Sequence, residues 1–141
     1  MNIAVLGDGA WGTALAILLA EKKHEVRLWS AFAENAESMQ RTRSNLKFLG
    51  DFAFPENLNP TADEATAVAE AEMVVFAIPT QFLRQGLMRF VAAPPAKSAI
   101  LVDVAKGIEV DTLLRPSQVI ADVIGRDDCA VLSGPSHAEE V

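Results

Sequence analysis

The stretch Asn2-Ile3-Ala4-Val5-Leu6-Gly7-Asp8-Gly9-Ala10-Trp11-Gly12 opens the chain and decides its fold. The apolar start predicts a strand, the glycines predict a tight turn, and the Ala/Leu-rich residues 13–20 predict a helix. Gly7 permits the sharp turn out of the strand, Gly9 lets the backbone approach a pyrophosphate, and Gly12 allows close helix–strand packing. The free N–H groups at the helix start then favour phosphate. This unit therefore predicts a dinucleotide site.

Composition limits the kind of protein that carries this unit. The 141 residues are close to the size of one domain. The formal charge is −7 and no Lys/Arg stripe occurs, which argues against a nucleic-acid partner. Charged residues interrupt every apolar run before the ~20 residues that a membrane span needs. The short apolar N-terminus has no basic region and no cleavage-site pattern, so it does not read as a signal peptide. We expect a cytoplasmic protein without a transmembrane segment.

The remaining candidates for metal or thiol chemistry are weak. The single cysteine, Cys129, excludes an internal disulfide framework and a cysteine-rich zinc site. It lies in an apolar run, so we expect a buried strand thiol and not a nucleophile. Glu139-Glu140 has no partner ligands at suitable spacing, and we predict no metal site. His137 follows Ser136 but lacks the third member of a hydrolase triad.

Strands and helices are expected to alternate along the rest of the chain. Further strands are predicted at residues 25–29, 73–78, 99–104 and 130–132. Helices are predicted at residues 33–41, 62–71 with Thr61 as N-cap, 81–91, and 117–124 with Pro116 in its first turn. Residues 44–60 are expected to form an irregular loop packed on the body. The pattern predicts an α/β domain over residues 1–141, a Rossmann-type doubly wound, mostly parallel sheet with helices on both faces.

Ligands in such sheets lie outside the carboxyl ends of the strands. Lys106 directly follows a buried strand and precedes a glycine, which points its charge at this crevice; the alternative is a solvated loop lysine. Residues 133–136, Ser-Gly-Pro-Ser, offer N–H groups and hydroxyls that suit an oxyanion or a phosphate. Equally, they could form an ordinary strand-to-helix turn.

Several blocks together resemble one family. They are residues 7–16, 24–29, 45–50, 54–58, 77–79, 106–109 and 132–141. In these blocks and their order the whole chain resembles the bacterial-type NAD(P)-dependent glycerol-3-phosphate dehydrogenases, which serve glycerophospholipid synthesis. The combination of Lys106-Gly107 with Ser133-Gly134-Pro135 is the specific part, since the glycine motif occurs in many dehydrogenases.

The resemblance implies a cofactor, a substrate and the residues that contact them. The cofactor would be NAD(H) or NADP(H), and the substrate pair dihydroxyacetone phosphate and glycerol 3-phosphate, interconverted by hydride transfer. Cofactor contacts would come from Gly7, Gly9, Ala10, Trp11, Gly12, Ala31, Phe82, Lys106 and Ala138. Substrate contacts would come from Lys106, Gly134 and Ser136. Lys106 would also serve as the catalytic electrostatic group.

Three departures from the family pattern qualify these expectations. Leu49 runs directly into Gly50 where the family has a proline between them. Asp8 places a carboxylate inside the phosphate loop and must point away from the pyrophosphate. The family's helical C-terminal domain, with a second lysine as general acid/base, is absent from these 141 residues. We therefore expect the N-terminal half of a homo-oligomeric enzyme, inactive alone.

Two other functions stay open at this point. One is a stand-alone nucleotide-binding or regulatory module, and the other is a different Rossmann dehydrogenase of the 3-hydroxyacid type. Cofactor choice is also open, because residues 29–31, Trp-Ser-Ala, carry neither an acid to hold ribose hydroxyls nor an arginine to hold a 2′-phosphate. This composition predicts weak discrimination between NADH and NADPH.

Overall fold

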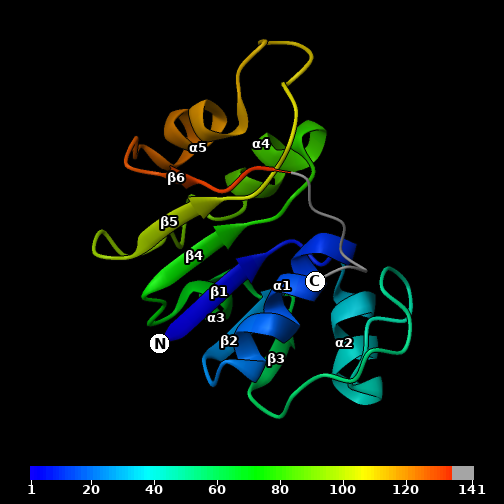
Figure 1. Cartoon of the computed structure of the whole chain (residues 1–141). Coiled ribbons are helices and arrows are strands. Elements are labelled where there is room, and N and C mark those ends of the chain that lie inside the picture. The colour runs from blue at the N-terminus through cyan, green and yellow to red at the C-terminus, as the bar shows by residue number, and fades with distance from the viewer. Residues whose placement is uncertain (135–141) are drawn as a thin grey trace.

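The computed structural model describes residues 1–134 and contains one six-stranded sheet with helices on both faces (Figure 1). The strands are β1 (Asn2–Leu6), β2 (Glu25–Trp29), β3 (Leu58–Thr61), β4 (Met73–Phe76), β5 (Ile100–Asp103) and β6 (Ala130–Val131). The helices are α1 (Ala10–Glu21), α2 (Ala33–Thr42), α3 (Glu64–Val68), α4 (Thr80–Met88) and α5 (Pro116–Ile124). The strand order is β3-β2-β1-β4-β5-β6 and every pairing is parallel, which confirms the predicted doubly wound fold.

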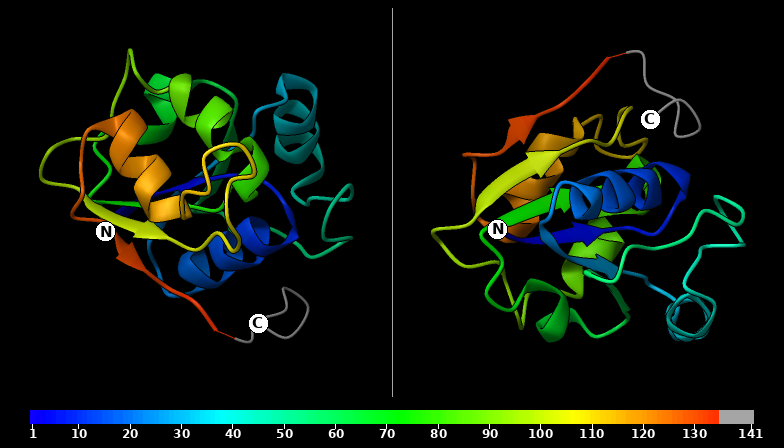
Figure 2. Two further views of the ribbon diagram at one scale, coloured as in Figure 1. Left: turned by 90° about the horizontal axis from the view of Figure 1, so that it is seen from above. Right: turned by 60° about the horizontal axis from the view of Figure 1, so that its bottom comes forward.

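Both faces of the sheet are buried, which explains the near-continuous apolar runs of its central strands. Side chains alternate along β1: Ile3 and Val5 pack in the core with α1 and α2, while Ala4 and Leu6 pack in the core with α3, α4 and α5. In the view from above, α1 and α5 lie on opposite sides of the strands (Figure 2). The two cores hold the sheet between layers of helices, and the parallel pairing brings all strand carboxyl ends to one edge.

The third strand is a correction to the sequence analysis. The loop expected over residues 44–60 ends early, because Leu58–Thr61 forms β3 beside β2. Proline removes an N–H donor from a strand, so Pro60 argued against this assignment. The position at the sheet edge resolves the conflict, because β3 pairs with β2 alone among the described strands.

The start of α3 is a second correction. The helix begins at Glu64, and its N-cap is Asp63, whose Oδ1 accepts a hydrogen bond from the Thr66 N–H at 2.6 Å. Thr61 is the last residue of β3, and its hydroxyl accepts from the Asp63 N–H instead. Both Thr61 and Asp63 are residue types that cap helices. Because Thr61 pairs with Trp29 of β2 as part of β3, Asp63 is the N-cap.

Two helix starts and the place of Cys129 also differ from the prediction. Helix α1 starts at Ala10 and α4 at Thr80, both earlier than expected, while α5 does begin on Pro116. Cys129 lies just before β6 and is only half-buried. The prediction of a buried thiol within a strand was therefore wrong. Burial raises the pKa of the Cys129 thiol to about 11, which leaves little thiolate at neutral pH. Among residues 1–134, no helix is long and apolar enough to cross a membrane.

Candidate functional site

A cavity of about 290 Å³ opens at the carboxyl ends of β1, β4 and β5. It is lined by Gly9, Ala10, Trp11, Gly12, Ala77, Ile78, Pro79, Val104, Ala105 and Lys106. In the strand order, β1 lies between β2 and β4. The chain adds β2 and β3 on one side of β1, and then crosses to the other side to add β4, β5 and β6. This is the switch point at which doubly wound sheets bind their ligands.

The glycine loop has the geometry that its sequence predicts. Gly7 has φ +118°, and a Cβ placed on it would lie 2.7 Å from the carbonyl carbon of Ala77. A Cβ on Gly12 would lie 2.0 Å from the Gly7 carbonyl oxygen. A Cβ on Gly9 would meet no atom within 4 Å, because Gly9 faces the open cavity. Gly7 and Gly12 therefore permit the turn and the close packing, and Gly9 leaves room for a ligand.

The start of α1 can receive an anion. Its N-cap is Gly9, no side chain caps it, and its first turn carries no acid. Asp8 is the one nearby carboxylate in this loop, and its Oδ2 accepts a hydrogen bond from Asn35 Nδ2 of α2 at 2.5 Å. Asp8 is not among the residues that line the cavity. The negative charge thus lies on the α2 side of the loop, as a phosphate at α1 requires.

The side chain of Asn45 stabilises the glycine loop by hydrogen bonds, a role that was not predicted from the sequence. Its buried amide Nδ2 donates to the Asp8 carbonyl at 2.7 Å and to Thr13 Oγ1 at 2.8 Å. Its own carbonyl accepts the N–H groups of residues 48, 49 and 50, so the same residue shapes the following turn. The sequence signals were its place at the start of the family-like block 45–50 and at the start of an apolar irregular segment.

Lys106 and Gly134 lie together in the structure. The Lys106 ammonium donates to the Gly134 carbonyl oxygen at 2.7 Å. The segment around Lys106 and the described part of the segment 133–136, which the sequence indicated separately, therefore meet beyond the carboxyl ends of β5 and β6. Ser136, His137 and Ala138 lie outside the described residues, so their predicted contacts are not placed.

The loop that carries Lys106 is fixed by side chains of α4. Thr80 Oγ1 donates to the Lys106 carbonyl at 2.7 Å, and Gln81 Nε2 donates to the Ile108 carbonyl at 2.9 Å. Further along, Arg84 Nη2 lies 3.0 Å from Glu109 Oε2 in an ion pair. The Arg84 guanidinium, followed by the Thr112 hydroxyl, lowers the pKa of the Glu109 carboxyl. These contacts place the lysine from a neighbouring helix.

Ala31 and Phe82, which the resemblance places near the cofactor, do not line the cavity. Ala31 is exposed just after β2, and its carbonyl accepts a hydrogen bond from Arg89 Nη1 at 2.8 Å. Phe82 is exposed in the first turns of α4. Both lie on segments that follow strand carboxyl ends, and both residues are exposed.

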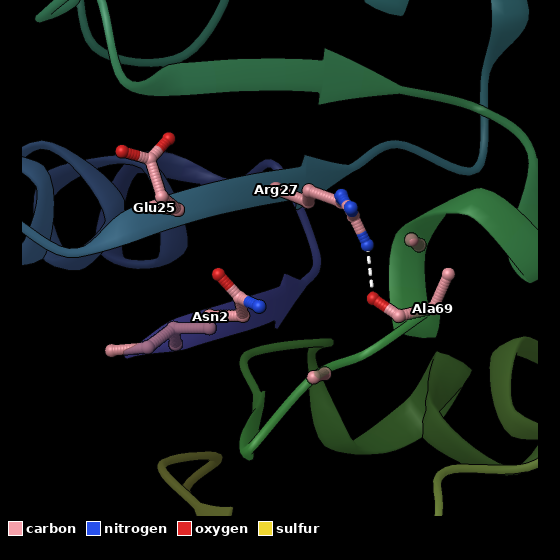
Figure 3. Close-up of a pocket in the computed structure, with 7 residues that line it drawn as sticks. Asn2, Glu25, Arg27 and Ala69 are labelled. Atoms are coloured by element: carbon pink, nitrogen blue, oxygen red, sulfur yellow. Dashed lines mark hydrogen bonds between the residues drawn. The ribbon is translucent and has the colours of Figure 1, made fainter.

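A second cavity lies elsewhere and is not a candidate. It measures about 20 Å³, room for about one water molecule, and its lining includes the strand starts Asn2 and Glu25. Arg27 closes one side by donating to the Ala69 carbonyl (Figure 3). Within the part of the chain that is described, no three His, Cys, Asp or Glu side chains gather to hold a metal ion.

A comparison of the sequence with known protein families shows which family the chain belongs to. Residues 2–141 match the family described as "NAD-dependent glycerol-3-phosphate dehydrogenase N-terminus". The chain belongs to this family. The resemblance stated from the sequence blocks is thereby confirmed, and with it the choice of glycerol-3-phosphate dehydrogenases over other dehydrogenases with the same glycine motif.

Individual relatives agree with the family. The chain is 46% identical over 146 residues to glycerol-3-phosphate dehydrogenase [NAD(P)+] of Chlorobium luteolum, covering 100% of this chain and 43% of the relative. The protein of the same name from Lysinibacillus sphaericus is 43% identical, with 99% and 42% covered. A crystal structure of glycerol-3-phosphate dehydrogenase from Coxiella burnetii matches with TM-score 0.90 at 31% identity, again with 99% and 42% covered. The chain thus spans less than half the length of these relatives.

Proposed function

We propose that residues 1–141 form the NAD(P)-binding domain of a glycerol-3-phosphate dehydrogenase, which reversibly reduces dihydroxyacetone phosphate to sn-glycerol 3-phosphate. One observation carries the proposal: the cavity at the switch point joins the glycine loop to Lys106. The family match supports the substrate. We also propose that the whole enzyme is a homo-oligomer and, from the composition of this chain, that it is cytoplasmic.

The residues present fit a nicotinamide dinucleotide. The uncapped start of α1 and the open face at Gly9 suit its pyrophosphate, with Ala10 and Trp11 beside it. Ala31 would contact the adenosine ribose, and Phe82 and Ala138 would contact other parts of the cofactor. When bound, the nicotinamide supplies the hydride.

Lys106 is the proposed catalytic and substrate-binding residue of this half. Its ammonium would polarise the ketone and offset the negative charge that develops on the oxygen during reduction. Gly134 and Ser136 would bind the substrate phosphate next to it, which agrees with the 2.7 Å contact between Lys106 and the Gly134 carbonyl. The proton would come from a second lysine, in the part of the relatives that lies beyond the match.

Binding measurements on two Gly9 variants test the cofactor site. Gly9→Asp puts a charge and a side chain where the pyrophosphate would lie, so NADH and NADPH binding should be lost in calorimetry. Gly9→Ala is the matched control for the fold, because its Cβ would meet nothing within 4 Å. A folded Gly9→Asp protein that binds NAD(P)H as well as the wild type would overturn the assignment.

A further inference from the structure

Two cations reach the carboxyl end of β2 from other parts of the chain. Arg89 directly follows α4, and its Nη1 donates to the Ala31 carbonyl at 2.8 Å. The carbon at the centre of its guanidinium lies 4.9 Å from the ring centroid of Trp29, the last residue of β2. The contact spans 58 residues of sequence, so inspection of residues 29–31 alone could not detect this arginine.

Lys47 is the second cation. Its Nζ lies 4.9 Å from the ring centroid of Phe32 and 4.8 Å from that of Phe48. Phe32 follows Ala31 directly and is the N-cap of α2. Arg89 and Lys47 therefore contact two successive residues of the segment that, in a doubly wound fold, lies against the adenosine ribose.

We propose that Arg89 and Lys47 form a binding site for the adenosine 2′-phosphate of NADPH. The inference rests on the proposed function and names a determinant of cofactor choice within it. Folds that accept NADP commonly hold this phosphate with an arginine near the end of β2, and no acid stands at residues 29–31 to repel it. Aromatic stacking holds both cations in place while leaving their N–H groups available.

Two acids limit the strength of this site. Glu64 Oε1 lies 2.5 Å from Arg89 Nη2, and the Arg89 side chain is still 41% exposed. A guanidinium has five N–H donors, so this ion pair and the bond to Ala31 leave donors for a phosphate. Glu34, in the first turn of α2, adds an opposing charge. The site should therefore permit NADPH without excluding NADH.

Titrations of the 141-residue chain with NADH and NADPH test the site. Arg89→Met and Lys47→Met should each raise the Kd for NADPH by about tenfold, since each removes a charged contact that is partly screened by solvent. The Kd for NADH should change less than about twofold, because the two cofactors differ only in the phosphate. Glu64→Gln should lower the Kd for NADPH, since it releases Arg89.

The controls separate this inference from the proposed function. Lys97→Met removes an exposed lysine just before the amino end of β5, whereas the proposed site lies at the carboxyl end of β2. This variant should change neither Kd. Lys47 makes no hydrogen bond in the described structure, so Lys47→Met keeps the test valid even if Arg89→Met fails to fold. Adenosine 2′,5′-bisphosphate and AMP serve as minimal probes. The inference is overturned if NADPH binding is unchanged both in Lys47→Met and in a folded Arg89→Met or Arg89→Lys protein. It is also overturned if these variants lose NADH and NADPH binding equally. Failure of the wild type to bind either cofactor overturns the proposed function instead.

Discussion

The hydroxyl of Thr80 donates a 2.7 Å hydrogen bond to the main-chain carbonyl of Lys106. A Cβ on the next residue, Gly107, would lie 3.3 Å from the same hydroxyl. The first turn of α4 therefore fits closely against the loop that presents the proposed catalytic lysine. We therefore propose that Thr80 acts through Lys106, as a positioning residue.

Replacing Thr80 by valine keeps the side-chain shape and removes the donor. NAD(P)H affinity should fall by about three- to tenfold, because the loss of one hydrogen bond frees the Lys106 loop. Thr80→Ser should retain the wild-type affinity. In a Lys106→Ala background the Thr80→Val effect should vanish, as a double-mutant cycle would show; an effect of the same size in both backgrounds would make Thr80 merely structural.

Lys106 itself is best tested in a protein of the relatives' full length. Lys106→Ala should lower kcat/KM by roughly one to two decades, the equivalent of one charge-assisted hydrogen bond in the transition state. The 141-residue chain should not turn over dihydroxyacetone phosphate, because the proposed proton donor is not within it. Steady oxidation of NAD(P)H by this chain alone would show that its own residues supply the proton.

Gly12 should be the least replaceable residue of the glycine loop. Gly12→Ala would bring a Cβ to 2.0 Å from the Gly7 carbonyl, so backbone must shift. We expect a loss of about 3 kcal/mol in the free energy of unfolding, at the upper end for overpacking. Denaturant titration measures it, with Gly9→Ala as the variant that adds the same methyl group in open space.

Asp103 gives the chain a stability term that depends on pH. Burial at the end of β5 raises the pKa of its carboxyl, against the opposing hydrogen bond from the Ala105 N–H. A raised folded-state pKa means that the stabilising contribution is complete below the unfolded value of 3.8 and is lost as pH rises through the folded value. Asp103→Asn should therefore raise the denaturation midpoint at pH 7 and converge with the wild type in acid. An unchanged midpoint at pH 7 would contradict this.

Glu109 should behave in the opposite way. Its pKa is lowered by Arg84 and Thr112, so its contribution is present above the unfolded value of 4.5 and disappears as pH falls through the folded value. Glu109→Gln should lower stability at neutral pH and have no effect in strong acid. The same denaturation series run on both variants gives opposite signs if the two assignments are correct.

The loop after Lys106 exposes apolar side chains that should promote self-association. Val110 is 69% exposed and Leu113 is 75% exposed, Ile108 is exposed in the same loop, and Phe82 is exposed on α4. Such surface usually meets a partner. We expect concentration-dependent dimers or larger species in sedimentation despite the net charge of −7, and fewer of them in a Val110→Ser, Leu113→Ser double variant. A wild type that stays monomeric at high concentration would contradict this.

Sequence alone predicted the parts of the structure in which local pattern and burial agree. The glycine loop and the strands beside it were predictable because Gly7 and Gly12 are required by backbone contacts, and because strands buried on both faces must be apolar throughout. Strand β3 was missed because a proline at the sheet edge reads like a loop. Asn45 and Arg89 were missed because their partners are distant in sequence, 37 and 58 residues away, and only folding brings them together.

The two tryptophans stand in contrasting places, and the chain has no tyrosine. Trp29 is buried and packs edge-on against Phe90 at 4.9 Å, whereas Trp11 lines the cavity. The emission of both residues should follow unfolding, and Trp11, which lines the cavity, should also be quenched by a bound reduced nicotinamide through energy transfer. Replacing Trp29 by phenylalanine would leave an optical reporter of ligand binding that needs no label.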